Sequence, residues 1–179
     1  MSHFNVCVLV KPDGSDLRRL EHKAETMLAN FDINKEVDPY KKYVDKDDIR
    51  QMAKSYKIGL NDFSTLAEKL KEWSGDTGGV DEGGLYGIST KNPNGHIDAW
   101  GISTQIKPED RGALLFGEGD EKICHAVVTP DGIWHSESPW VYGSPNADEE
   151  KELAIWTKKM STLLNEYKDA VAFLADCHI

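Results

Sequence analysis

Two almost wholly apolar segments, one near each end of the chain, constrain its fold more than any other feature. Residues 4–10 read FNVCVLV and residues 170–175 read AVAFLA. A strand with one face in water alternates apolar and polar side chains, whereas a strand covered on both faces is apolar throughout. We therefore expect both segments to be interior strands of a sheet whose two faces are covered.

Between these strands, the spacing of apolar residues predicts three helices, two hairpins and a fourth helix. The expected helices cover residues 17–31, 49–56 and 63–73, and the fourth begins near residue 147. The expected hairpins cover residues 85–104 and 123–135, with turns at 92–95 (NPNG) and 129–132 (TPDG). Residues 34–43 are expected to be a charged link, and residues 74–84 a Gly-rich loop.

This order of elements predicts an α+β fold with about four helices and a mostly antiparallel sheet. The first and last strands are expected to be central and adjacent, as they are in ferredoxin-like sheets. No segment of the sequence has the composition of a linker between two domains, so residues 1–179 are expected to form a single domain.

Composition limits the cellular location and the classes of partner that we expect for this protein. The three cysteines form no Cys-x-x-Cys pair, which argues against a disulfide framework or a zinc knuckle and favours a reducing cytoplasm. No apolar run approaches the roughly 20 residues of a membrane span. The net charge of −10 disfavours nucleic-acid partners. The acidity has two interpretations, namely solubility or a surface that mimics nucleic acid and occupies a basic host protein.

The candidate chemistry lies at the tips of the terminal strands. His3 begins the first strand, and Asp176 and His178 end the last. If the two strands are antiparallel neighbours, these side chains meet; if they are parallel, about 20 Å separates the tips. Two imidazoles and a carboxylate can bind a divalent ion such as Zn, Mn or Fe, or can act as a general acid–base pair. The structural alternative is that they are solvated end residues.

Two further histidines, His125 and His135, lie in the second expected hairpin. A three-residue loop would place them on one face of the hairpin, and a four-residue turn on opposite faces. The sequence does not choose between these arrangements. Either histidine could extend the cluster at the strand tips, as a ligand or a proton carrier.

The remaining motifs are weaker indications of function. The glycines of residues 75–84 precede no phosphate-binding Lys-Ser/Thr motif, which indicates a connector. Cys7 lies in an apolar strand and is expected to be a small buried hydrophobe. The aromatic residues Trp134, Trp140 and Tyr142 either flank the core or line a groove for a ligand or partner.

Four segments resemble a family of small, uncharacterised proteins encoded by bacteriophages and prophages. They are residues 1–4 (MSHF), 37–43 (VDPYKKY), 127–132 (VVTPDG, followed by Trp134 and His135) and 176–179 (DCHI). A Gly-Gly-Arg-Trp motif of that family is absent from residues 96–104. The resemblance implies a phage accessory protein in the bacterial cytoplasm. It also places His3, His135, Asp176 and His178 at family-like positions.

These observations leave two functional hypotheses. The first is an accessory protein that binds a host protein or a small ligand, with a counter-defence role. The second is a metal-dependent hydrolase with His3, Asp176 and His178 as metal ligands and His135 as a further catalytic residue. The sequence does not decide whether the protein is an enzyme, and the oligomeric state, the substrate and any host target stay open.

Overall fold

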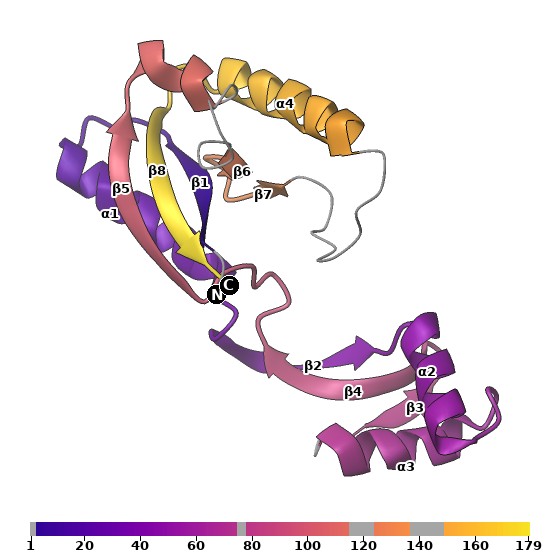
Figure 1. The fold of residues 1–179 in the computed structure, drawn as a ribbon. Helices are drawn as coiled ribbons and strands as arrows, with labels where there is room; N and C mark the ends of the chain where they lie inside the picture. Colours follow the sequence, from indigo (N-terminus) through magenta and orange to yellow (C-terminus); the bar gives the residue numbers. More distant parts are fainter. Residues whose placement is uncertain (1–2, 75–77, 115–123, 137–148) are drawn as a thin grey trace. The chain divides into compact units, whose positions relative to one another are not determined.

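The chain folds into two compact units, each with its own sheet and core (Figure 1). The structure, a computed structural model, describes residues 3–74, 78–114, 124–136 and 149–179. Unit 1 comprises Met1–Lys35 and Pro93–Ile179, and unit 2 comprises Glu36–Asn92. Whether they act as the single domain expected from the sequence stays a prediction.

Unit 1 contains a five-stranded sheet in which the two terminal strands are central. Its strands are β1 (His3–Val10), β5 (Ala99–Ile106), β6 (Cys124–Val128), β7 (Trp134–Ser136) and β8 (Val171–His178). Their order is β5-β8-β1-β6-β7, with β6 parallel to β1 and the other neighbours antiparallel. The expected α+β class, the mostly antiparallel sheet and the adjacency of the first and last strands are confirmed.

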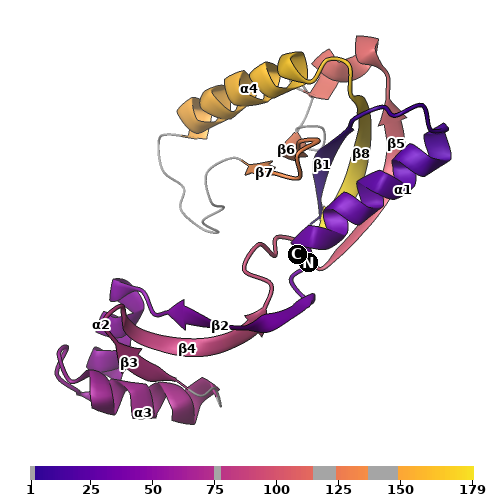
Figure 2. The same cartoon turned by 180° about the vertical axis from the view of Figure 1, so that it is seen from behind.

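Two helices cover opposite faces of this sheet, which explains why its two central strands are apolar over most of their length (Figures 1 and 2). Helix α1 (Leu17–Leu28) packs on the alternate residues Val6, Val8 and Val10 of β1. Helix α4 (Glu149–Glu166) packs on the intervening residues Cys7 and Leu9. Successive side chains of a strand point to opposite faces, so β1 needs an apolar residue at every position from Val6 to Val10, where it is covered on both sides.

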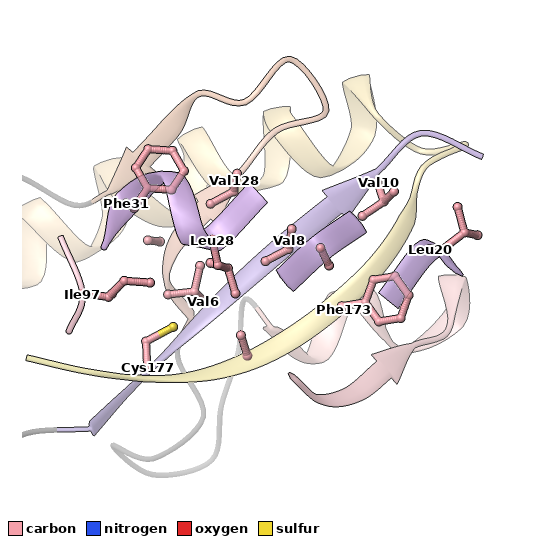
Figure 3. Close-up of a cluster of buried hydrophobic side chains, with 13 residues drawn as sticks. Val6, Val8, Val10, Leu20, Leu28, Phe31, Ile97, Val128, Phe173 and Cys177 are labelled. Atoms are coloured by element: carbon pink, nitrogen blue, oxygen red, sulfur yellow. The ribbon is translucent and has the colours of Figure 1, made fainter. Parts of the chain in front are cut away.

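The core under α1 joins segments that are far apart in the sequence (Figure 3). It gathers Leu20 and Leu28 of α1, Phe173 of β8 and Ile97, all at most 5% exposed. Each fully buried side chain of this size stabilises the fold by about 1.5–3 kcal/mol. Two short 3₁₀ helices, η1 (Ala29–Phe31) and η2 (Pro108–Leu114), follow α1 and β5.

Unit 2 is a small antiparallel sheet with two helices. Its elements are β2 (Glu36–Tyr43), α2 (Lys46–Tyr56), α3 (Phe63–Ser74), β3 (Gly79–Asp81) and β4 (Gly84–Lys91). The strand order is β2-β4-β3. Asp45 caps α2 by accepting from the backbone amides of Asp47 and Asp48, a role that carboxylates fill well at a helix start. The core contains Ala53, Leu66, Leu70 and Leu85.

Unit 2 is an insertion between neighbouring positions of unit 1. Asp32 and Ile97 form a β-bridge, and the amide of Ile33 donates to the carbonyl of Ile97 over 2.8 Å. The amide of His96 likewise donates to the carbonyl of Phe31 over 2.7 Å. The chain therefore leaves unit 1 and re-enters it at the same place.

Two expectations about local structure are wrong. The charged link expected at residues 34–43 contains β2, and the first expected hairpin does not exist, because β4 and β5 belong to different sheets. Alternating side chains reveal a strand but not its partner, and here β5 pairs with the distant β8, while β4 pairs with the distant β2 and with its neighbour β3. Within the expected Gly-rich loop, residues 79–81 form β3.

The second hairpin is confirmed, since β6 and β7 pair around the turn at residues 129–132. Gly132 takes a φ of 79° there, a backbone conformation that glycine adopts without strain. None of the helices in the described ranges is long and apolar enough to cross a membrane.

Candidate functional site

The antiparallel pairing of β1 and β8 places the first histidine of the chain directly opposite the last. His3 pairs with His178 in this register, and their ring centroids are 5.2 Å apart in an edge-on arrangement. Both views of the ribbon show the start of β1 and the end of β8 at the same end of the sheet (Figures 1 and 2). The antiparallel alternative considered for the sequence is therefore the one that occurs.

His178 is held by a carboxylate that the sequence analysis did not select. Its Nδ1 lies 2.6 Å from Oδ1 of Asp98, and the two side chains are 16% and 32% exposed. Asp98 immediately precedes β5, and its backbone amide donates to the carbonyl of His178 over 3.0 Å. The pairing of β5 with the end of β8 thus fixes both partners of this hydrogen bond.

His3 is held by the second carboxylate of the cluster. Its Nδ1 lies 3.2 Å from Oδ1 of Asp176, and this pair is the more exposed one, at 67% and 54%. Asp176 and His178 lie on the same face of β8 because side chains alternate along a strand. Each imidazole therefore has a carboxylate of its own.

In the neutral form of each ring, these contacts favour one tautomer. An ionised carboxylate only accepts hydrogen bonds, so the ring nitrogen that faces it, Nδ1, carries the proton. The remaining nitrogen, Nε2, then has its lone pair available to accept a proton. This arrangement, in which a carboxylate orients an imidazole through Nδ1, is the one that makes histidine a general base in hydrolases. The site thus contains two oriented imidazoles side by side.

The expected metal centre receives no support from this geometry. The three predicted ligands, His3, Asp176 and His178, do lie together, but Asp176 is engaged by His3. Among the described residues, no three or more His, Cys, Asp or Glu side chains are arranged to hold a metal ion. A site for Zn, Mn or Fe stays a prediction.

His135 does not join the cluster. It pairs with Val127, which in turn pairs with Cys7, four residues along β1 from His3. At a rise of about 3.3 Å per residue, this places His135 roughly 13 Å along the sheet and two strands across. Its Nε2 lies 3.3 Å from Oγ1 of the buried Thr129 instead. Burial, reinforced by the charge of Lys159, lowers the pKa of His135.

The other residues considered for a site also lie elsewhere. His125 packs its ring against Phe4, with centroids 6.1 Å apart. Trp134 belongs to an aromatic cluster with Phe31 and His96, whose rings lie 5.0 and 4.7 Å from it. Trp140 and Tyr142 lie outside the described residues.

The cysteines are structural. Cys7, Cys124 and Cys177 are all buried and free. Burial raises the pKa of Cys7 and of Cys177 to about 12 and that of Cys124 well above its ordinary value. A thiol that stays protonated is a poor nucleophile. The expectation that Cys7 acts as a buried hydrophobe is confirmed.

Comparison of the chain with protein-family models, curated proteins and solved structures finds no match. The resemblance to phage proteins therefore stays a prediction, and function has to be argued from the site itself.

Proposed function

We propose that the cluster at the terminal strands is the active site of a hydrolase that works by general acid–base catalysis. The observation that carries this proposal is that His178 and His3, side by side, are each held at Nδ1 by a separate carboxylate. The His178 side chain is only 16% exposed, which is unlike a solvated end residue. Two histidines, each held through Nδ1 and lying on adjacent strands, form the pair of proton carriers that hydrolysis requires.

The roles follow from burial and hydrogen-bond length. His178, the less exposed ring with the shorter contact to Asp98, acts as the base, and its Nε2 takes a proton from the attacking water. The water oxygen forms a bond to the electrophilic atom of the substrate, and the bond to the leaving group breaks. His3, in its protonated form, donates its Nε2 proton to the leaving group. A proton passing from His178 to His3 then restores the starting state.

Asp98 and Asp176 are positioning residues in this scheme. Each holds one ring in a productive orientation and stabilises the imidazolium form that appears during the cycle. A correctly placed general acid or base contributes about 10²–10⁴-fold to a rate. Removal of either histidine is therefore expected to have a large effect.

The proposal is tested by the release of 4-nitrophenol from a carboxylate ester, a phosphomonoester, a phosphodiester and a glycoside, with and without EDTA. We expect at least one substrate to be hydrolysed with EDTA present, and the activity to be lost in His178→Ala and strongly reduced in His3→Ala. The matched control is His22→Ala, because His22 is also paired with a carboxylate, Glu25, at 3.3 Å but lies on the exposed surface of α1. Equal rates in the three variants would refute the proposal, and activity abolished by EDTA would favour the metal-dependent alternative.

A second proposal retains the accessory binding role in the bacterial cytoplasm that the phage resemblance implies. It is supported by one face of the unit 2 sheet. Helices α2 and α3 cover Leu85 on the other face. On the first face, Tyr43 pairs with Tyr86, and the Lys41 ammonium lies 4.3 Å from the Tyr86 ring centroid. Lys41 and Tyr43 both hydrogen-bond to Asp81, and Tyr43 is 47% exposed. Tyrosine is enriched in protein interfaces.

Affinity capture from a bacterial lysate tests this second proposal. We expect a discrete host protein to be retained by the natural chain and released by Tyr43→Ser. Tyr56→Ser is the matched control, because Tyr56 is similarly exposed, at 43%, and also has a lysine, Lys69, over its ring. Equal retention by both variants would count against the surface.

A further inference from the structure

We propose that the acid–base site hydrolyses acyl compounds whose acyl group is uncharged or cationic, and that this group lies over Gly101 of β5. This inference rests on the proposed hydrolase function and adds to it the class of substrate and a residue that admits it. Three features of the described residues carry it: the small side chains beside the site, the charge around it, and the engagement of its carboxylates.

The small side chains lie on β5. In the register of β5 and β8, Ala99 pairs with His178 and Gly101 pairs with Asp176. Directly paired residues share a face of the sheet, so Ala99 and Gly101 lie beside the imidazole and the carboxylate. A Cβ placed on Gly101 would meet no atom of the described residues within 4 Å. The surface of the sheet next to the site, here called the floor, thus consists of backbone and the methyl group of Ala99.

The helix on the same face packs further along the sheet. The side chains of α4 pack with Cys7 and Leu9 of β1, Ile106 of β5 and Ala172 of β8. These positions lie toward the opposite end of the strands from His3, Ala99 and His178. Among the described residues, the floor at Gly101 therefore begins where the packing of α4 ends.

The charge around the site disfavours anions. Asp98 and Asp176 form their ion pairs with histidines, and no Lys or Arg of the described ranges forms an ion pair with either of them. Unit 1 as a whole carries 20 acidic residues against 12 basic ones. A phosphate or carboxylate group at Gly101 would therefore approach a site in which the two carboxylates outnumber the one protonated imidazole, His3, whereas an uncharged or cationic group would not be repelled.

The state of the two carboxylates points to acyl transfer to water. Glycoside hydrolysis uses two carboxyl groups that act directly on the substrate, whereas here each is hydrogen-bonded to an imidazole. In acyl transfer, the water oxygen bonds to the carbonyl carbon as His178 Nε2 takes its proton. The carbon–oxygen bond to the alcohol then breaks, and the alcohol leaves with the proton from His3.

The inference is tested with three 4-nitrophenyl esters of similar acyl length, namely the uncharged butyrate, the cationic 4-aminobutyrate and the anionic hemisuccinate. Each is assayed with the full chain, with His178→Ala, and with Gly101→Val. Gly101 needs no left-handed backbone, so valine is compatible with its place in a strand. Gln105→Val is the matched control, because it puts the same side chain on the same strand beside Phe173, on the face under α1.

We expect kcat/KM for the butyrate and the 4-aminobutyrate to exceed that for the hemisuccinate at least tenfold. We also expect Gly101→Val to lower kcat/KM for these two esters at least tenfold, mainly through KM, at an unchanged melting temperature. Gln105→Val should retain activity. A preference for the hemisuccinate, or full activity in Gly101→Val, would overturn the substrate inference while leaving the hydrolase proposal intact. No hydrolysis of any of the three esters would likewise overturn the substrate inference alone, since the hydrolase proposal also covers phosphate esters and glycosides. Hydrolysis of all three esters that does not depend on His178 would overturn both.

Discussion

His178 and Asp98 are 80 positions apart in the chain, yet Nδ1 of one lies 2.6 Å from Oδ1 of the other. The contact exists because β5 and β8 pair along their length, so that the residue before β5 meets the end of β8. The weaker contact between His3 and Asp176, at 3.2 Å, is made across the next strand pair. The two bonds differ in length and exposure, and this difference makes their roles separable by experiment.

Replacement of Asp98 by Asn should reduce His178-dependent hydrolysis more than replacement of Asp176 by Asn. An amide at position 98 can donate to Nδ1 and so favour the tautomer with the proton on Nε2, which cannot act as a base. We expect a loss of about 10²–10⁴-fold in kcat for Asp98→Asn, and a smaller loss for Asp176→Asn. Steady-state kinetics across pH 5–9 measure both, and equal losses would contradict the assigned roles.

The stability of the protein should fall as the pH is lowered below about 6.5. Burial lowers the pKa of both His96 and His135 in the folded protein, whereas in the unfolded chain a histidine titrates near 6.5. The unfolded state therefore binds more protons over this range, so stability is complete above the unfolded pKa and is lost as the pH falls through it. Urea unfolding at pH 7.5, 6.5 and 5.5 should show this slope. His135→Gln should reduce it, and an unchanged slope in that variant would contradict the prediction.

The three thiols should be unreactive in the folded protein. All three are buried, and the raised pKa values of Cys7 and Cys177, at about 12, leave almost no thiolate at neutral pH. A disulfide reagent such as Ellman's should therefore label none at pH 8 and all three after unfolding in guanidinium. Labelling of any cysteine at a rate independent of denaturant would contradict the burial of that thiol.

Loss of the Arg111 side chain should destabilise unit 1 strongly. Arg111 is 8% exposed, and its guanidinium donates to the carbonyls of Lys168 and Ala170, between the end of α4 and the start of β8. Its removal leaves these carbonyls without their charged donor, so Arg111→Ala should lower the free energy of unfolding by about 2–4 kcal/mol. Arg50→Ala removes an exposed ion pair with Asp47 and should change it by less than about 0.5 kcal/mol. Denaturant melts of both variants give the comparison, and similar values would contradict it.

Unit 1 should fold without unit 2. The bridge between Asp32 and Ile97 holds the two ends of the insertion together within unit 1. We expect a chain with Glu36–Asn92 replaced by a short Gly-Ser linker to unfold cooperatively and to retain His178-dependent hydrolysis. Circular dichroism melts and the ester assay check both points. A disordered product would show that the two units form one cooperative domain, as the sequence analysis expected.

The sequence alone determined the centre of unit 1. The apolar runs at residues 4–10 and 170–175 indicated two interior strands, because only a strand covered on both faces lacks polar positions. The helical spacing of Leu20, Ala24 and Leu28 likewise identified the stripe that α1 buries. The composition of the hairpin turn at residues 129–132 predicted the pairing of β6 with β7. All of these signals are local, since each depends on residues within a few positions of one another.

The sequence alone determined the candidate site only in part. His3, Asp176 and His178 could be selected because they are polar residues at the tips of apolar strands, but whether they meet depended on strand direction. Asp98 left no signal, because it lies outside the terminal strands and becomes a partner of His178 only when β5 pairs with β8.

Only the tertiary structure decided how the strands are shared between two sheets. β4 and β5 look like the arms of a hairpin, yet β4 pairs with β2 and β3, and β5 pairs with β8. The pairing of β5 with β8 brings Asp98 to the end of the last strand, and the pairings of β6 with β1 and with β7 place His135 away from the tips of the terminal strands. Side-chain alternation fixes which residues of a strand face the core, but its pairing partner depends on long-range burial and hydrogen bonding, which no local pattern records.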